Sequence, residues 1–472
     1  MTDPDGPPAS NLEAGGSSRF RPRVGPDGSA GWWHRHMHRT MLFAARTYYQ
    51  VAAVGEEVPR RGPVLLVANH PNSLLDPALV ALAAGRPMRF LARAPLFQHR
   101  GIGWMVRGSG SIPVYRQADD PELMGRNRDS FQAVQESLAA GSAVGIFPEG
   151  LSHSAPALAP IKTGAARIAL ATAQLTGGPF PVLPVGLTFR GGKERFRSDA
   201  LILVGKPIRW SDLAEAGTGD PEAVRELTRR IQVGLSRVTV NLQRWEDFPV
   251  VEMAEAVHQA EYGATRNPNP VRWLARMRRT AHALERARKE GDPGAEELAE
   301  GLMEHQRVLE SVGLSPADLH QVPRTSVAVR WTLRNLVFFG LAAPLAVLGW
   351  LAFLVPWSVL KYAEPRFRLP SDRRATYRVL GGSVVFGVWV LLLALGARYG
   401  LGWRPAMVLL AVLPLLGFVT LAIRDRWGDA ISDLRRFLVL RGRADIRARL
   451  LARQRELADE IRRLQGRLEG DR

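Results

Sequence analysis

Residues 64–77 read VLLVANHPNSLLDP, and they give the strongest indication of the fold. The first part, residues 64–68, is a short apolar run, which is typical of a strand buried on both faces of a sheet. The second part is polar, with His70 directly after the strand and Asp76 six residues further on. A carboxylate at this distance can hold one ring nitrogen of the histidine, so that the other nitrogen acts as a general base. Taken alone, the stretch fits a capping aspartate beside a hydrogen-bonded histidine equally well.

Further apolar runs of the same kind lie on either side of helix-like stretches. The predicted strands are residues 143–147, 182–187 and 200–204, and the predicted helices are residues 127–140, 164–175 and a closing helix at 222–245. Strands that alternate with helices predict an α/β fold, in which a sheet carries helices on its faces.

The composition limits the classes of function. The chain has 472 residues, of which 46% are hydrophobic and 23% charged, as in ordinary folded proteins. It contains no cysteine, which excludes disulfides, thiolate metal sites and a cysteine nucleophile. The net charge of +18 favours an anionic partner such as a membrane surface or phosphorylated molecules. No basic-aromatic platform or groove-reading motif is present, so we expect no nucleic-acid partner.

The N-terminal segment divides into two parts. Residues 1–30 are rich in Gly, Pro, Ser and Asp, which predicts a disordered tail, and they carry no secretory signal. The α/β part of the chain, residues 31–245, then opens with residues 32–51, which contain no Gly or Pro and mix aromatic with arginine side chains. They predict an amphipathic helix that lies on a bilayer surface or covers the core of the domain.

The C-terminal half reads as helices of two kinds. Residues 246–327 have helical spacing and predict a helical appendage. Residues 328–428 form an apolar region in which charge-free stretches of bilayer length predict a membrane hairpin at 379–423. Residues 335–360 are also free of charge but contain two prolines, and we expect them to enter the membrane without crossing it. Residues 429–472 predict a basic C-terminal helix.

The distribution of basic residues predicts the orientation of the hairpin. Six Lys and Arg side chains lie between Lys361 and Arg378, and a basic run follows Ile423. Only Arg398 and Arg404 flank the turn between the two helices. The positive-inside rule therefore places both ends of the hairpin in the cytoplasm.

Three further motifs follow the histidine in order. They are Gly110–Arg116, a strand that ends in arginine; Phe147–Gly150, which reads Phe-Pro-Glu-Gly; and Val182–Gly186, an apolar strand with a proline. An arginine at a strand end suits a phosphate group, and a glycine lets the backbone approach a ligand. Each motif alone has a plainer explanation, such as a surface ion pair for Arg116 or a structural turn at Glu149.

The four motifs together, in this order and spacing, resemble the glycerolipid acyltransferase family, which comprises glycerol-phosphate and lysophosphatidate acyltransferases. The resemblance covers residues 40–215. The commonest family form has four residues between the histidine and the aspartate, whereas five separate His70 and Asp76 here. The subgroup similar to fungal-type dual-substrate glycerol-3-phosphate acyltransferases also has five. It shares Phe-Pro-Glu-Gly-x-Ser-His, as in residues 147–153, and Lys-x-Gly, as in residues 162–164.

The resemblance implies the catalytic roles. His70 would deprotonate the acceptor hydroxyl, and Asp76 would orient its ring. The acyl donor would be a thioester on CoA or acyl carrier protein, and no metal or other cofactor would be needed.

The resemblance also implies an acceptor site. Arg116 would bind the phosphate of the acceptor, while Glu149 and Gly150 would shape the site around its hydroxyl groups. We add Lys162 as a second phosphate contact.

The expected function is that of a membrane-bound O-acyltransferase in phospholipid synthesis. It would move a fatty acyl group to glycerol-3-phosphate or lysophosphatidate, with its catalytic domain on the cytoplasmic face of the membrane. Two alternatives stay open at this point: an acyltransferase for another lysophospholipid or hydroxyl acceptor, and a catalytically inactive homologue that binds lipid.

Overall fold

The computed structural model describes most of the chain. The described residues are 31–116, 122–263, 270–320, 325–363, 366, 371–442 and 444–470. The predicted disordered tail, residues 1–30, lies outside these ranges.

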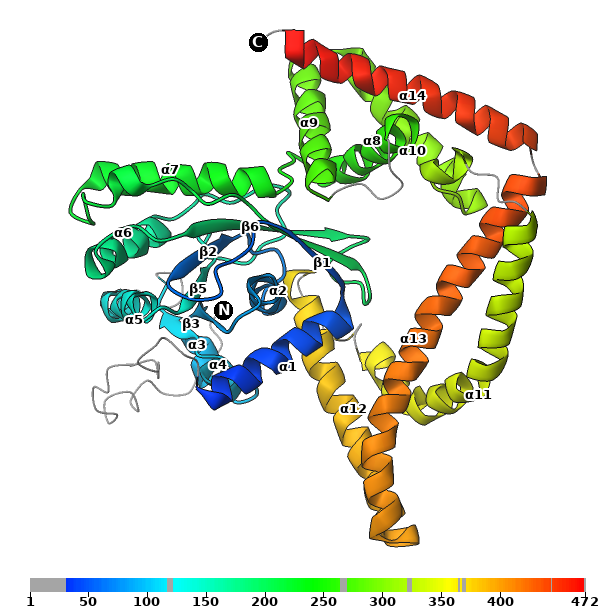
Figure 1. Ribbon diagram of the computed structural model, residues 1–472, viewed down its shortest axis with the longest axis horizontal. Coiled ribbons are helices and arrows are strands. Elements are labelled where there is room, and N and C mark those ends of the chain that lie inside the picture. The colour runs from blue at the N-terminus through cyan, green and yellow to red at the C-terminus, as the bar shows by residue number, and fades with distance from the viewer. Residues whose placement is uncertain are drawn as a thin grey trace, which may run out of the picture.

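A seven-stranded sheet forms the centre of the N-terminal half (Figure 1). Its strands are β1 (Gln50–Gly55), β2 (Val64–Ala68), β3 (Met88–Arg93), β4 (Ile112–Val114), β5 (Ala143–Ile146), β6 (Val182–Arg190) and β7 (Asp199–Val204). They are arranged in the order β1-β7-β6-β2-β5-β3-β4. All neighbours are parallel except β6 and β7, so β1 and β7 run opposite to the other five strands.

Helices cover both faces of the sheet, as the sequence predicts. They are α1 (Trp32–Tyr48), α2 (Leu75–Ala84), α3 (Ala94–Gln98), α4 (Gly103–Gly108), α5 (Asn127–Ala139), α6 (Gly164–Thr176) and α7 (Pro221–Val238), with short 3₁₀ turns at Glu122–Arg126 and Ser211–Leu213. Side chains alternate across a strand. Leu65 and Val67 of β2 therefore pack in one cluster with α5, α6 and α7, and Val64 and Leu66 pack in another with α1 and α2. All five residues of β2 are buried.

Some predicted boundaries are wrong. The helix predicted at 32–51 ends at Tyr48, because Gln50 and Val51 begin strand β1 and pair with β7. The closing helix predicted at 222–245 ends at Val238. The remaining predicted strands and helices of this half are confirmed within a few residues.

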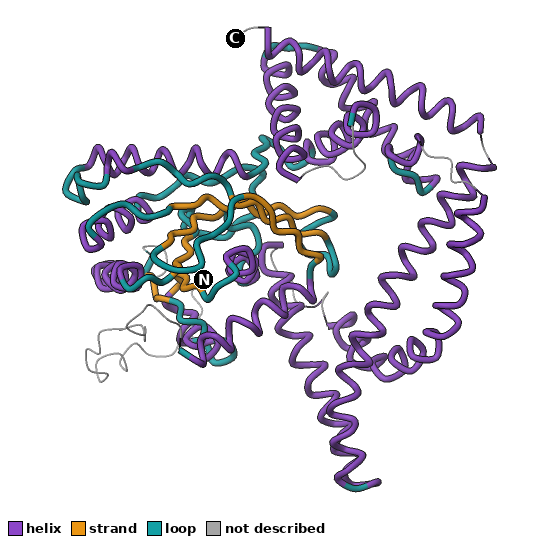
Figure 2. The backbone as a smooth tube through the Cα atoms, viewed as in Figure 1, coloured by secondary structure: helices purple, strands orange, loops and turns teal. Residues whose placement is uncertain are grey.

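The helical appendage is a helix bundle to which the last helix of the chain also belongs. It consists of α8 (Asp247–Tyr262), α9 (Pro270–Lys289), α10 (Pro293–Val312), a 3₁₀ turn at Pro316–His320 and α14 (Ala444–Gly470). Leu457 and Ile461 of α14 are fully buried, and Gln454 donates to Glu261 of α8 at 2.6 Å. The predicted basic helix 429–472 is thus two helices, and the second one packs in the appendage (Figure 2).

In the sequence, three long apolar helices lie between the 3₁₀ turn at Pro316–His320 and α14. They are α11 (Thr325–Ala363), α12 (Ser371–Leu401) and α13 (Trp403–Gly442). All three are long and apolar enough to cross a membrane. The hairpin predicted at 379–423 corresponds to α12 and α13, which are joined at Gly402. Helix α11 continues through Pro344 and Pro356 without a break, and Figure 1 shows it curved; whether it crosses a bilayer stays a prediction.

Candidate active site

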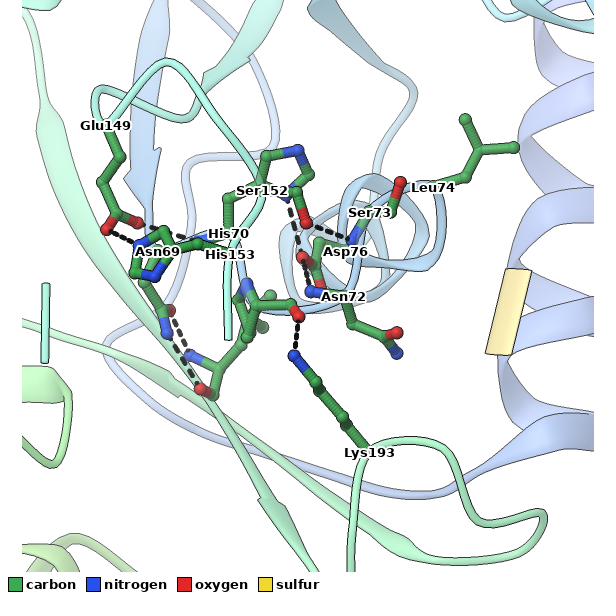
Figure 3. Close-up of polar contacts among 12 residues, drawn as sticks. Asn69, His70, Asn72, Ser73, Leu74, Asp76, Glu149, Ser152, His153 and Lys193 are labelled. Carbon is green, nitrogen blue, oxygen red and sulfur yellow. Dashed lines mark hydrogen bonds and ion pairs between the residues drawn. The ribbon is translucent and has the colours of Figure 1, made fainter. Parts of the chain in front are cut away.

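The turn after β2 holds a histidine–aspartate pair. His70 Nδ1 lies 2.9 Å from Asp76 Oδ2, and the same oxygen accepts the backbone N–H of Asn72 at 2.7 Å (Figure 3). The Asp76 side chain is fully buried, whereas that of His70 is 16% exposed. A carboxylate accepts from Nδ1–H, so Nε2 is the nitrogen left to act as a base. The sequence prediction of a His–Asp pair is therefore matched by the geometry.

The five-residue spacing is accommodated by a left-handed residue. Ser73 has φ of 49°, a conformation that few residues other than glycine adopt. The chain turns there, and the N–H groups of Leu75 and Asp76 bond back to the carbonyls of Asn72 and Ser73, both at 3.3 Å. The N–H of Ser73 donates to Ser152 Oγ at 3.0 Å. Ser152, two residues after the Phe-Pro-Glu-Gly motif, thus supports the turn that brings Asp76 to His70.

The electrostatics of the pair depend on its hydrogen bonds. Burial raises the pKa of Asp76, and the bonds from His70 and the Asn72 N–H act in the opposite direction. Nearby, burial raises the pKa of Tyr49, so its hydroxyl stays protonated. Asn72 is fully buried and donates to that hydroxyl. Burial therefore opposes ionisation of the Asp76 carboxyl, while its hydrogen bonds and the positive charge of Lys193 favour it.

Neighbouring strands bring the motifs to one edge of the sheet. β2 pairs in parallel with β5 on one side and β6 on the other, so the residues that follow β2 and β5 meet. Phe147 after β5 stacks on the His70 ring, with the centroids 4.0 Å apart and the planes at 13°. Asn69 exchanges two hydrogen bonds with the backbone of Leu187 in β6. The residue after β5 thus packs on the His70 ring, and β6 holds the preceding residue, Asn69.

Glu149 is buried and its carboxylate is occupied by protein donors. Its side chain is 1% exposed. Oε1 accepts the backbone N–H of His70 at 3.0 Å, while Oε2 accepts the N–H of Ala159 at 2.7 Å and hydrogen-bonds the ring of His153. These contacts make Glu149 a positioning residue for the His70 backbone; direct binding of an acceptor hydroxyl stays a prediction.

Gly150 and Lys162 lie against each other beside this carboxylate. Gly150 has φ of 73°, and a Cβ there would come within 2.7 Å of the Lys162 ammonium. The N–H of Lys162 donates to the Pro148 carbonyl at 2.9 Å. The lysine side chain is exposed, and no hydrogen bond or ion pair of its ammonium is found among the residues that the structure describes. The structure thus places a cation next to the Phe-Pro-Glu-Gly turn.

Arg116 lies further along the same edge. It follows β4 by two residues and is half-buried. β4 is three positions from β2 in the sheet, which corresponds to about 14 Å at about 4.8 Å per strand. The backbone of Tyr115 is held by Asn127, which accepts its N–H at 2.8 Å and donates to its carbonyl at 2.7 Å. An acceptor molecule would therefore have to extend from His70 toward β4 to reach the guanidinium.

Lys193 is a residue of the site that was not predicted from the sequence. This lysine lies in the loop between β6 and β7 and points toward the turn after β2 (Figure 3). Its ammonium donates to the Pro71 carbonyl and to Ser154 Oγ, the latter at 2.6 Å. It therefore links the loop after β2 to the loop after β5. More than a hundred residues separate it from His70, so no local pattern could identify it. Within the described ranges, no three His, Asp or Glu side chains gather as metal ligands.

Comparisons with known proteins find relatives of this chain. The Acyltransferase family model matches residues 50–188. The chain is 27% identical over 278 residues to glycerol-3-phosphate O-acyltransferase 2 of Saccharomyces cerevisiae, covering 57% of this chain and 36% of that protein. It is 30% identical over 232 residues to lyso-ornithine lipid O-acyltransferase of Pseudomonas aeruginosa, covering 49% of this chain and 74% of that protein.

The extent of these matches differs. The chain spans about a third of the length of the yeast relative. Among solved structures, the 1-acyl-sn-glycerophosphate acyltransferase of Thermotoga maritima overlaps with a TM-score of 0.32 and 20% identity, covering 43% of this chain and 79% of that chain.

Proposed function

Because the chain belongs to the glycerolipid acyltransferase family, we propose that it transfers a fatty acyl group from a thioester to a hydroxyl of glycerol-3-phosphate or lysophosphatidate. The observation that carries this proposal is the His70–Asp76 pair, ordered by Phe147 and the Glu149 carboxylate at one edge of the sheet. The donor is acyl-CoA or acyl carrier protein.

The geometry supports a direct transfer with His70 as the base. Nε2 of His70 takes the proton of the acceptor hydroxyl, and the oxygen attacks the thioester carbonyl. The new C–O bond forms, the C–S bond breaks, and the leaving thiolate receives the proton from the imidazolium. Asp76 keeps Nδ1 protonated and stabilises the positive ring while it exists.

The cations at the edge of the sheet suit a phosphorylated acceptor. Lys162 presents its ammonium beside Gly150, and Arg116 lies further along the same edge. An arginine can grip a phosphate with two hydrogen bonds, and lysine contributes a point charge. We assign the acceptor phosphate to the space between these two side chains.

The hairpin supports attachment to a membrane with the catalytic domain beside the basic ends. Arg374 near the start of α12 pairs with Glu194 of the catalytic domain at 2.6 Å, and Asp425 of α13 pairs with Arg197 at 2.7 Å. Both ends of the hairpin thus adjoin the catalytic domain. By the positive-inside rule this side is cytoplasmic, where we place the enzyme on the inner membrane surface.

The packing of α14 supports the same topology. α14 follows the three apolar helices but packs on α8, α9 and α10, which precede them. Tyr262 of α8 donates to Asp459 of α14 at 2.6 Å, and Gln465 donates to Thr280 at 2.9 Å. The chain must therefore cross the bilayer an even number of times. The hairpin accounts for two crossings, so we infer that α11 enters without crossing.

The decisive experiment uses the full chain purified in detergent. Acyl-CoA and acyl carrier protein thioesters are offered with glycerol-3-phosphate, lysophosphatidate and lyso-ornithine lipid in turn, and the acylated product is measured. We expect turnover with a phosphorylated acceptor and a loss of about 10²–10⁴ in rate for His70→Ala. Full activity of a folded His70→Ala protein would contradict the mechanism.

The phosphate site is tested in the same assay. Lys162→Met and Arg116→Ala should each raise KM for the phosphorylated acceptor by roughly ten- to a hundred-fold, the value of one charge-assisted contact. Lys206→Met is the matched control, because this exposed lysine follows β7, whose carboxyl end lies at the opposite edge of the sheet. A rise in the donor KM instead would assign these side chains to the thioester carrier.

Two other functions are outcomes of the same experiment. Turnover with lyso-ornithine lipid alone would favour a different hydroxyl acceptor, in line with the Pseudomonas relative. Lipid binding without turnover would favour an inactive homologue; the intact His70–Asp76 pair argues against it.

A further inference from the structure

The first turns of helix α12 lie against residues 69–77, the loop that carries His70 and Asp76 and is called the catalytic loop below. The N–H of Leu74, between His70 and Asp76, donates to Thr376 Oγ1 of α12 at 3.3 Å. Ala375 is fully buried in the same apolar cluster as Leu75 and Tyr49. A segment that begins a membrane hairpin thus supplies part of the packing and one hydrogen-bond acceptor to the turn that carries the base.

A second contact joins the hairpin to the loop between β6 and β7, residues 191–198. Arg374 donates to the Glu194 carboxylate at 2.6 Å, and Arg378 donates to the Glu194 carbonyl. The same carbonyl accepts the hydroxyl of Tyr48 at 2.7 Å. Further along the loop, Arg197 pairs with Asp425 of α13. Both helices of the hairpin are therefore bound to this one loop.

The same loop holds the active site from its other side. Lys193, directly before Glu194, donates to the Pro71 carbonyl and to Ser154 Oγ. Its own carbonyl accepts the hydroxyl of Tyr49, which in turn accepts a hydrogen bond from Asn72. Since the Asn72 N–H donates to Asp76, an unbroken series of contacts runs from α12 to the carboxylate of the pair.

We propose that the hairpin is a positioning element of the active site. Arg374 and Arg378 bind loop 191–198, Thr376 binds the catalytic loop, and these contacts keep His70 and Asp76 at hydrogen-bond distance from each other. The kinetic part of this inference rests on the proposed function. Loops that carry catalytic groups are otherwise among the least stable parts of a fold, and a displacement of about 1 Å can cost about a hundred-fold in rate. The hairpin would thus couple membrane attachment to catalytic competence.

The test removes the contacts while the protein stays in detergent, so that membrane attachment cannot vary. The variants are Arg374→Ala with Arg378→Ala, and the milder Thr376→Val, which keeps the side-chain shape and loses the acceptor for the Leu74 N–H. The matched control is Arg398→Ala with Arg404→Ala, which removes the same charge from the opposite end of the hairpin. Hydrogen exchange of residues 69–77 and kcat are measured for each.

We expect faster exchange at residues 69–77 and at least a ten-fold lower kcat in the Arg374/Arg378 variant, with a smaller change of both in Thr376→Val and none in the control. Exchanging the charges, as Arg374→Glu with Glu194→Arg, should restore part of kcat relative to Arg374→Glu alone. Unchanged exchange, or faster exchange with unchanged kcat, would overturn the inference. If the wild-type protein acylates no acceptor, the proposed function fails, and the exchange result alone then decides whether the hairpin holds the loop.

Discussion

Replacement of Asp76 by asparagine should separate the charge of the pair from its geometry. Asp76 Oδ2 accepts both the Nδ1–H of His70 and the N–H of Asn72, at 2.9 and 2.7 Å. The amide oxygen of an asparagine can occupy the same position and accept both bonds. The Asp76→Asn variant therefore keeps the two hydrogen bonds that orient the ring and the turn, and it loses the negative charge.

The lost charge sets the size of the effect. In the transition state His70 carries a positive charge, and with Nδ1 2.9 Å from Asp76 Oδ2 we take the two centres of charge as about 4 Å apart. Their attraction is worth about 4 kcal/mol at an effective dielectric constant of about 20. Since about 1.4 kcal/mol corresponds to a factor of ten in rate, kcat should fall by about 10³. The KM for the thioester donor should stay within about two-fold, because donor binding does not involve this charge.

The assay follows the thiol released from acyl-CoA with a thiol-specific dye. The chain has no cysteine, so the protein contributes no background. Asp247→Asn is the matched control: this carboxylate is also largely buried, but it pairs with Arg288 in the appendage, and its loss should lower the melting temperature without changing kcat. A folded Asp76→Asn protein with kcat within ten-fold of the wild type would refute the charge argument.

Three further predictions follow from other parts of the structure. Ser152→Ala removes the acceptor of the Ser73 N–H and should lower kcat about ten-fold, whereas Ser152→Thr should not; equal kcat in the two would contradict the role of this bond. Burial lowers the pKa of His34 to about 4, below its value in the unfolded chain. The free energy of unfolding should therefore be highest above about pH 6.5 and fall toward pH 4, by about 3 kcal/mol at most. His34→Gln should flatten thermal unfolding across this pH window, and parallel curves for variant and wild type would disprove it. In intact cells, the Gly400→Cys variant should react with a membrane-impermeant thiol reagent and the Tyr377→Cys variant should not. The reverse pattern would contradict the proposed orientation of the hairpin.

The elements that could be predicted from the sequence are those with a simple apolar pattern. β2, β5, β6 and β7 are continuous apolar runs because both faces of these strands are covered. β1 escaped prediction because most of its residues are exposed at the edge of the sheet. β3 escaped because Arg89 and Arg93 interrupt its pattern, although Arg89 is buried and donates to the Gly110 carbonyl.

The residues of the candidate site likewise include some that could be predicted from the sequence and some that could not. His70 and Asp76 are local to one turn, and Phe147 to Gly150 follow a recognisable strand, so their order in the sequence indicated the site. Lys193 and Thr376 lie far along the chain from the histidine, and each makes its contact through the tertiary fold. The bundle role of α14 could not be predicted because its basic composition is equally typical of a solvated surface helix.

The packing of α14 on α8, α9 and α10 has a consequence for how the protein is made. Tyr262 of α8 and its hydrogen-bond partner Asp459 of α14 are 197 positions apart in the sequence. At about 5–20 residues per second, a ribosome needs roughly 10–40 s to synthesise this stretch. During that time the apolar surfaces of α8, α9 and α10 that α14 later covers are exposed, while the α/β domain can already fold. The nascent appendage is therefore the part of this chain that we expect to need a chaperone, and a premature stop before Leu457 would leave it open to proteolysis.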